Sequence, residues 1–76
     1  MASLADLNDL QTAVLSGFDP SLPEGWRRRF EDLGMVPGTR VSRLQSAPLG
    51  DPLAFLVRGS VLCLRREQAR LIRVRP

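Results

Sequence analysis

The feature that most constrains the fold is a series of short β-favouring runs, separated by glycine and proline, in the second half of the chain. Residues 39–45, 53–58 and 61–64 form three such runs, and the segment ARLIRVR at residues 69–75 forms the last. Gly59 and Ser60 read as a two-residue hairpin turn, because glycine at the first position supplies a positive φ. Short antiparallel strands at this spacing close most readily into a small barrel.

The N-terminal part adds one more strand and a leading arm. Residues 12–18 (TAVLSGF) are rich in β-favouring residues, and alternate positions share one face. Before them, leucines recur at every third position, which suits one helical turn or an arm laid onto the core. These leucines are Leu4, Leu7 and Leu10. A short 3-10 turn is expected at residues 66–68.

One α-helix is predicted at residues 23–33. Pro23 suits a first helical position, with Ser21 as a candidate cap, and Gly34 is the expected left-handed residue after the helix. An apolar stripe at i, i+4 and i+7 is expected to pack on the barrel. The stripe consists of Trp26, Phe30 and Leu33.

Length and charge bound the function. A chain of 76 residues predicts a single domain over residues 1–76. The first 24 residues hold four acidic residues and no base, whereas residues 25–76 hold all 11 arginines against four acidic residues, which gives −4 and +7. A basic surface attracts nucleic acid or an acidic protein face. No apolar run approaches a membrane span, the N-terminus does not read as a secretory signal, and a single cysteine suits a reducing cytoplasm.

The composition argues against enzyme chemistry and against the usual metal motifs. The chain has no histidine, lysine or tyrosine, so no acid–base set can be assembled. Cys63 lies in the apolar run VLCLR and is expected to be a small buried hydrophobic residue. One cysteine without histidine gives no zinc or iron motif of the usual spacing. A ferrous or calcium site built from scattered carboxylates and a metal at a contact between two chains stay open as alternatives.

The stretch SAPLGDP at residues 46–52 is the most distinctive loop. Two prolines lack N–H groups and Asp51 repels phosphate, so it is a poor phosphate cradle. A role as a rigid turn accounts for every residue of the stretch except Leu49. Leu49 either folds back on the core or projects as an apolar contact.

Nucleic-acid binding is the alternative function. Arginines are spread along the predicted strands and helix, and small barrels do bind RNA and DNA. The four aromatic residues, however, belong to the helix stripe and to strand faces, and none stands among arginines as a stacking platform. Nucleic acid is therefore not the expected partner.

The order of elements resembles the FeoA family of bacterial ferrous iron uptake. The resemblance runs from about residue 10 to residue 74 and rests on DLGMVPG at residues 32–38 and APLGDP at residues 47–52. The segments LRREQA and IRV follow in the expected order. Two positions depart from the family pattern: Arg43 stands where an apolar strand residue is usual, and Ser60 where an aromatic residue is common.

The resemblance implies a mainly β fold, a small SH3-like β-barrel of about five strands with one inserted α-helix. It also implies a cytoplasmic accessory protein, without a required cofactor, that contacts the membrane ferrous iron transporter FeoB or its cytoplasmic G-domain and reaches the membrane only through that transporter. The candidate partner-binding residues are Pro48, Leu49, Gly50, Asp51 and Arg65.

Overall fold

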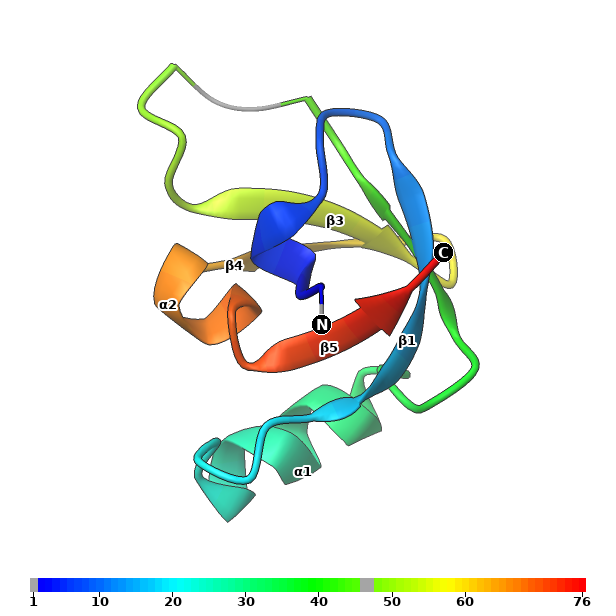
Figure 1. Cartoon of the computed structure of the whole chain (residues 1–76), viewed down its shortest axis with the longest axis vertical. Coiled ribbons are helices and arrows are strands. Elements are labelled where there is room, and N and C mark those ends of the chain that lie inside the picture. Colours follow the sequence, from blue (N-terminus) through cyan, green and yellow to red (C-terminus); the bar gives the residue numbers. More distant parts are fainter. Residues whose placement is uncertain (1, 46–47) are drawn as a thin grey trace.

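The computed structural model describes residues 2–45 and 48–76. Over these residues the chain forms one curled antiparallel sheet, two α-helices and one 3-10 helix (Figure 1). In chain order the elements are η1 (Leu4–Asp6), β1 (Thr12–Phe18), α1 (Glu24–Asp32), β2 (Arg40–Arg43), β3 (Leu53–Val57), β4 (Ser60–Leu64), α2 (Arg66–Ala69) and β5 (Ile72–Arg75). Strand order in the sheet is β4-β3-β2-β1-β5.

The core lies on the inner face of the sheet, as the alternation of apolar residues predicts. Leu15, Phe55 and Ile72 come from three different strands and are fully buried together. β1 pairs with β2 through its first half and with β5 from Val14 onward, and the register of the β1–β5 pairing shifts between Leu15 and Gly17. The strand predicted at residues 12–18 is confirmed with the same bounds.

The hairpin between β3 and β4 turns one residue earlier than the sequence predicts. Val57 pairs with Ser60, so the two turn residues are Arg58 and Gly59, not Gly59 and Ser60. Both have positive φ, 50° and 80°, as a type I′ turn requires. Glycine therefore occupies the second turn position, and arginine takes the left-handed conformation at the first.

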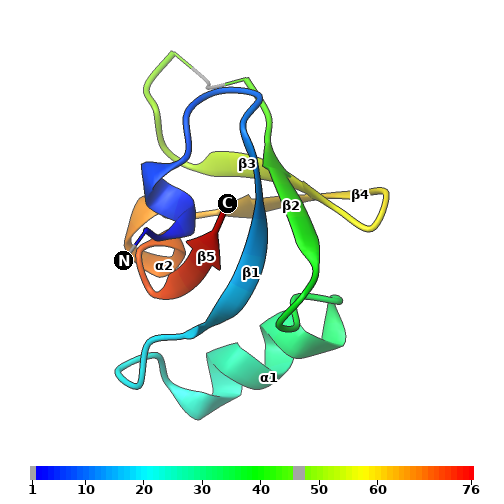
Figure 2. The same cartoon turned by 45° about the vertical axis from the view of Figure 1, so that its right-hand side comes forward.

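The helix is confirmed, but the burial of its apolar stripe is wrong at two of three positions. Phe30 is buried, whereas Trp26 and Leu33 are 44% and 46% exposed. The reason is visible in Figure 2, where α1 crosses one end of the sheet, so that little of its length faces the core. Phe30 stacks against Phe18 with ring centroids 6.5 Å apart, and Trp26 packs on the outer side of Phe30.

The two short helices also differ in detail from the sequence interpretation. Residues 66–68, expected as a 3-10 turn, belong to the four-residue α-helix α2, and the 3-10 helix is η1 instead. In η1 the side chain of Asp6 accepts a hydrogen bond from the N–H of Ser3 at 2.8 Å, which closes its first turn. Leu4 and Leu7 are buried as expected, but Leu10 is 73% exposed.

The end of α1 is joined to the β3–β4 turn through Gly34 and Arg58. Gly34 has φ +94°, the left-handed conformation predicted for it. The Nε of Arg58 donates to the carbonyl of Gly34 at 3.3 Å, and a Cβ at position 34 would lie 2.7 Å from the Cδ of Arg58. Both the backbone conformation and the space therefore demand glycine here.

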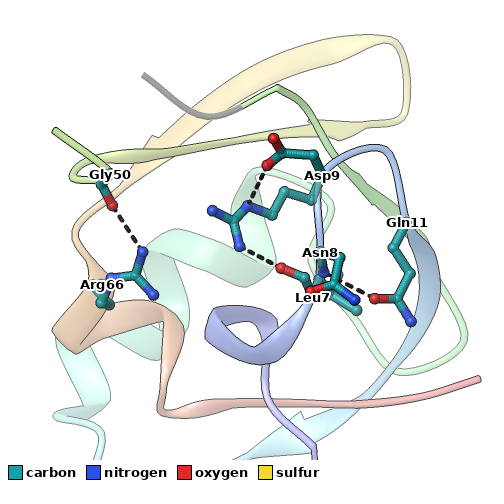
Figure 3. Close-up of polar contacts among 7 residues, drawn as sticks. Leu7, Asn8, Asp9, Gln11, Gly50 and Arg66 are labelled. Atoms are coloured by element: carbon teal, nitrogen blue, oxygen red, sulfur yellow. Dashed lines mark hydrogen bonds and ion pairs between the residues drawn. The ribbon is translucent and has the colours of Figure 1, made fainter. Parts of the chain in front are cut away.

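Arg43 stands at an inward-facing position of β2 and is only 8% exposed. Its guanidinium donates to the carbonyl of Leu7 and lies 3.7 Å from a carboxylate oxygen of Asp9 (Figure 3). Its backbone pairs with Leu10 and Gln11, so the whole residue connects β2 to the N-terminal segment. An arginine replaces an apolar residue here because a main-chain acceptor and a carboxylate meet its charged end.

We expect Phe30→Ala to destabilise the protein by about 3–5 kcal/mol and Trp26→Ala by only about 1–2 kcal/mol, because only Phe30 loses fully buried contacts. Urea denaturation of the two variants measures both values. Equal or reversed losses would contradict the placement of Trp26 at the surface.

We expect Arg43→Met to lower the free energy of unfolding by about 1–3 kcal/mol, because the Leu7 carbonyl loses its donor while the side chain keeps its apolar volume. The matched variant Asp9→Asn removes the half-exposed charge and should cost under about 1 kcal/mol. Equal losses in urea denaturation would mean that the ion pair, not the hydrogen bond to Leu7, carries the stabilisation.

Candidate functional site: an exposed loop and a groove

The loop that follows β2 projects from the end of the molecule opposite to α1 (Figures 1 and 2). Pro48 and Leu49 form its tip, and Leu49 is 91% exposed. Of the two placements open for Leu49 from the sequence, folding back on the core is therefore wrong. The first two residues of the stretch, Ser46 and Ala47, lie outside the described residues.

The base of this loop is bonded to the start of α2. The guanidinium of Arg66 donates to the carbonyl of Gly50 at 2.9 Å (Figure 3). The backbone N–H of Arg66 donates to a carboxylate oxygen of Asp51 at 3.0 Å. A carboxylate at a helix N-terminus accepts an N–H that has no partner inside the helix. These bonds therefore fix Gly50 and Asp51, the end of the loop that leads into β3, against α2.

The structure separates the five candidate residues into two kinds. Gly50 and Asp51 make the fixed base, whereas Pro48, Leu49 and Arg65 are exposed and available for contact. Arg65 immediately precedes α2, and its N–H donates to the side chain of Gln68 at 3.1 Å.

Arg66 was missed by the sequence interpretation. Its acceptor is a main-chain carbonyl, which leaves no pattern of side chains to recognise. The repeated arginines of LRREQA were the available signal, but they did not distinguish the residue that binds the loop from its exposed neighbour.

A second feature is a groove between α1 and β4, hereafter the α1–β4 groove, with a volume of about 530 Å³. Its apolar lining includes the half-exposed Trp26 and Leu33 from α1, and Leu62 and Cys63 from β4. The prediction that Cys63 is buried is wrong, since its thiol is exposed. Leu62 and Leu64 turn inward along β4, which places Cys63 on the other face, and a continuous apolar run conceals this alternation.

The position of α1 depends in part on the turn before it. The hydroxyl and N–H of Ser21 donate to Asp19 at 2.7 and 2.8 Å, and Arg73 of β5 donates to it at 2.9 Å. These bonds lower the pKa of Asp19 from 3.8 to about 2. Because the folded pKa is lowered, the contribution to stability is present above 3.8 and is lost as the pH falls through about 2. Ser21 thus bonds Asp19 instead of capping the helix.

Residues 2–45 and 48–76 hold neither a metal-binding cluster nor a membrane-spanning helix. Within them, no three histidine, cysteine, aspartate or glutamate side chains gather closely enough to hold a metal ion. No helix among these residues has the length and apolar character needed to cross a membrane.

Comparison with known protein families adds a match that spans nearly the whole chain. A family model described as the FeoA domain matches residues 2–76. The matched range includes residues 32–38 and 47–52, the two stretches on which the resemblance in the sequence rests.

Solved structures agree with this match. The FeoA protein of Chlorobium tepidum is 34% identical, with a TM-score of 0.89 over 97% of this chain and 69% of that one. A FeoA-like protein of Clostridium acetobutylicum is 33% identical, with a TM-score of 0.81 over 95% of this chain and 81% of that one.

A third similar structure is that of Stenotrophomonas maltophilia FeoA in complex with zinc, which is 29% identical, with a TM-score of 0.84 over 97% of this chain and 89% of that one. It is described as a prokaryotic SH3 domain protein and as a possible activating factor of bacterial ferrous iron transport. The likeness confirms the mainly β, SH3-like fold predicted from the sequence.

Proposed function

Because this chain belongs to the FeoA family, whose members are connected with ferrous iron transport, we propose that it is an accessory module of that transport. It acts by direct contact with the cytoplasmic part of the transporter FeoB, and its place is therefore the cytoplasm. It performs no covalent chemistry of its own, in keeping with a chain that has no histidine, lysine or tyrosine.

The observation that carries this proposal is the apolar loop tip on a fixed base. Leu49 is 91% exposed, while Gly50 and Asp51 just behind it are bonded to α2. An apolar side chain in water gains free energy when a partner covers it. Residues already held in place beside the contact lose little conformational entropy on binding. Arg65, exposed and next in sequence to the Arg66 that holds the loop base, adds a positive charge suited to an acidic patch on the partner.

A metal is not part of the proposed contact. The Stenotrophomonas relative was solved in complex with zinc. Without histidine, this chain offers zinc only Cys63 and carboxylates, and its described residues bring no three of them together. They do not fit a zinc site within one chain.

We expect Leu49→Ser to weaken capture of the purified G-domain of FeoB by about tenfold or more, since the apolar contact of a full leucine is worth about 1.5–3 kcal/mol. The melting temperature should stay unchanged, because the side chain is already exposed. Biolayer interferometry and thermal melting of the same preparation measure the two effects.

Leu10→Ser is the matched control, since Leu10 is also exposed, at 73%, but lies outside this loop. It should leave both capture and melting unchanged. If both serine variants bind the G-domain as wild type does, the loop tip is not the contact.

The competing function, nucleic-acid binding, draws some support from the exposed Trp26, which shares the α1–β4 groove with Arg29. A tryptophan beside an arginine is the kind of stacking surface that the sequence interpretation had found missing.

We expect single-stranded RNA or DNA to bind this protein only weakly and to dissociate as salt is raised to the physiological range, because arginine–phosphate attraction alone falls steeply with ionic strength. Fluorescence anisotropy with labelled oligonucleotides at several salt concentrations measures this. Tight binding at physiological salt that Trp26→Ala abolishes would favour the nucleic-acid function instead.

A further inference from the structure

The two edge strands of the sheet, β5 and β4, differ in what covers their outer edges. The outer edge of β5 is covered by the N-terminal segment, where Ser3 bridges to Arg73 and Val74 donates to the carbonyl of Ala2 at 3.0 Å. β5 also carries two arginines, which discourage further pairing. The opposite edge, β4, has the sequence SVLCL with no charge and no proline. Among the described residues, only β3 pairs with it.

The register of the hairpin shows which backbone groups this edge presents. A two-residue turn closes on a hydrogen-bonded pair, here Val57 and Ser60, and hydrogen-bonded pairs then alternate along the ladder. Leu62 and Leu64 therefore bond to β3, whereas the N–H and C=O groups of Val61 and Cys63 point away from it. Within residues 2–45 and 48–76, no backbone hydrogen bond from another element reaches Val61 or Cys63.

This edge is apolar on both faces. Val61 is 59% exposed and lies across from Leu56, which is exposed too, so the outer face carries an apolar pair. The α1–β4 groove, with Trp26 and Leu33, runs along the same strand. A row of available backbone groups flanked by apolar surface is the arrangement to which an extended peptide adds as a further strand.

We propose that the edge of β4 binds an extended segment of a partner protein as an added β-strand. The segment carries apolar side chains at alternate positions, which cover Val61 or enter the α1–β4 groove, and acidic residues at its ends. The inference rests on the proposed function to the extent that the partner is a protein, and it names the kind of segment recognised.

Charge favours such a segment over a second copy of this chain. Arg58 and Arg65 lie near the two ends of β4, and Arg29 lines the groove. Glu67 lines a neighbouring hollow beyond Trp26. Pairing β4 with β4 of another copy about a two-fold axis would bring Arg58 of each copy toward Arg65 of the other. Like charges at both ends oppose that dimer, whereas acidic ends on a partner strand are attracted.

The test uses the intact protein and the blocked peptide Asp-Glu-Val-Thr-Val-Thr-Val-Glu-Asp. We expect the peptide to bind and to slow amide hydrogen exchange at Val61 and Cys63 by about tenfold or more, because their N–H groups gain partners only in the complex. The amides of Leu62 and Leu64, already bonded to β3, should change little. A peptide N-methylated at each valine and threonine should not bind, and one with lysine in place of each acidic residue should bind more weakly.

A variant pair tests the same edge from the side of the protein. Val61→Lys places a charge on the edge strand at an exposed position, which should weaken peptide binding by about tenfold without altering the melting temperature. Leu10→Lys, the matched change at another exposed position, should bind the peptide as wild type does. Absence of peptide binding, or binding without change at Val61 and Cys63, would overturn the inference. Self-association of the protein that Val61→Lys abolishes would also overturn it, in favour of a second copy.

The two proposals fail in distinguishable ways. If Val61→Lys binds the FeoB G-domain as wild type does while Leu49→Ser does not, the accessory function stands and the strand-edge contact falls. If wild-type protein captures no part of FeoB, the proposed partner is wrong, and the peptide experiment still decides whether the β4 edge accepts a strand.

Discussion

A chain of 76 residues has one sheet face to bury, and the ordered elements of this protein are arranged around that face. Leu15, Phe55 and Ile72 meet there from distant parts of the sequence. The N-terminal segment and α2 pack on the same interior through Leu4 and Ala69. A small domain buries only about 60% of the surface of its unfolded chain, so most of its apolar side chains are needed in the core. The apolar residues left outside are therefore informative about contact with other molecules.

The sequence predicted those features of the fold that neighbouring residues determine, and missed those that depend on packing between distant segments. The first strand was predicted to the residue, and the helix to within one residue at each end, because alternation and turn chemistry are local. The exposure of Trp26 and Leu33 was not predictable, since a stripe identifies the apolar face of a helix but not how much of it another element covers. Cys63 was misplaced for the same reason, because an uninterrupted apolar run does not say which face is inside. The buried position of Arg43 depends on the Leu7 carbonyl, a main-chain group that no sequence pattern reports.

The exposed loop was predicted in part, but the bonds that hold its base were not. The stretch APLGDP was recognised as a shaped turn, and its apolar tip does project into solvent. The bonds from Arg66 that hold the base of the loop join residues 15 and 16 apart in the chain, so spacing alone gives no sign of them. The same short helix that anchors the loop also supplies Gln68 to the α1–β4 groove. The loop tip and the groove thus share one support, although they lie toward different ends of the molecule.

The contact between Gly34 and Arg58 has a consequence for how sequences of this kind can diverge. Asparagine tolerates the left-handed backbone better than most residues, yet its Cβ would still collide with Arg58. Moving Arg58 aside would cost its bonds to the Gly34 carbonyl and to Thr39. A single substitution at position 34 therefore meets two penalties at once, and relieving one leaves the other in force. Substitutions at positions 34 and 58 are therefore not independent in their effect on stability, because shortening the arginine removes the close contact but leaves the strain of a φ of +94°.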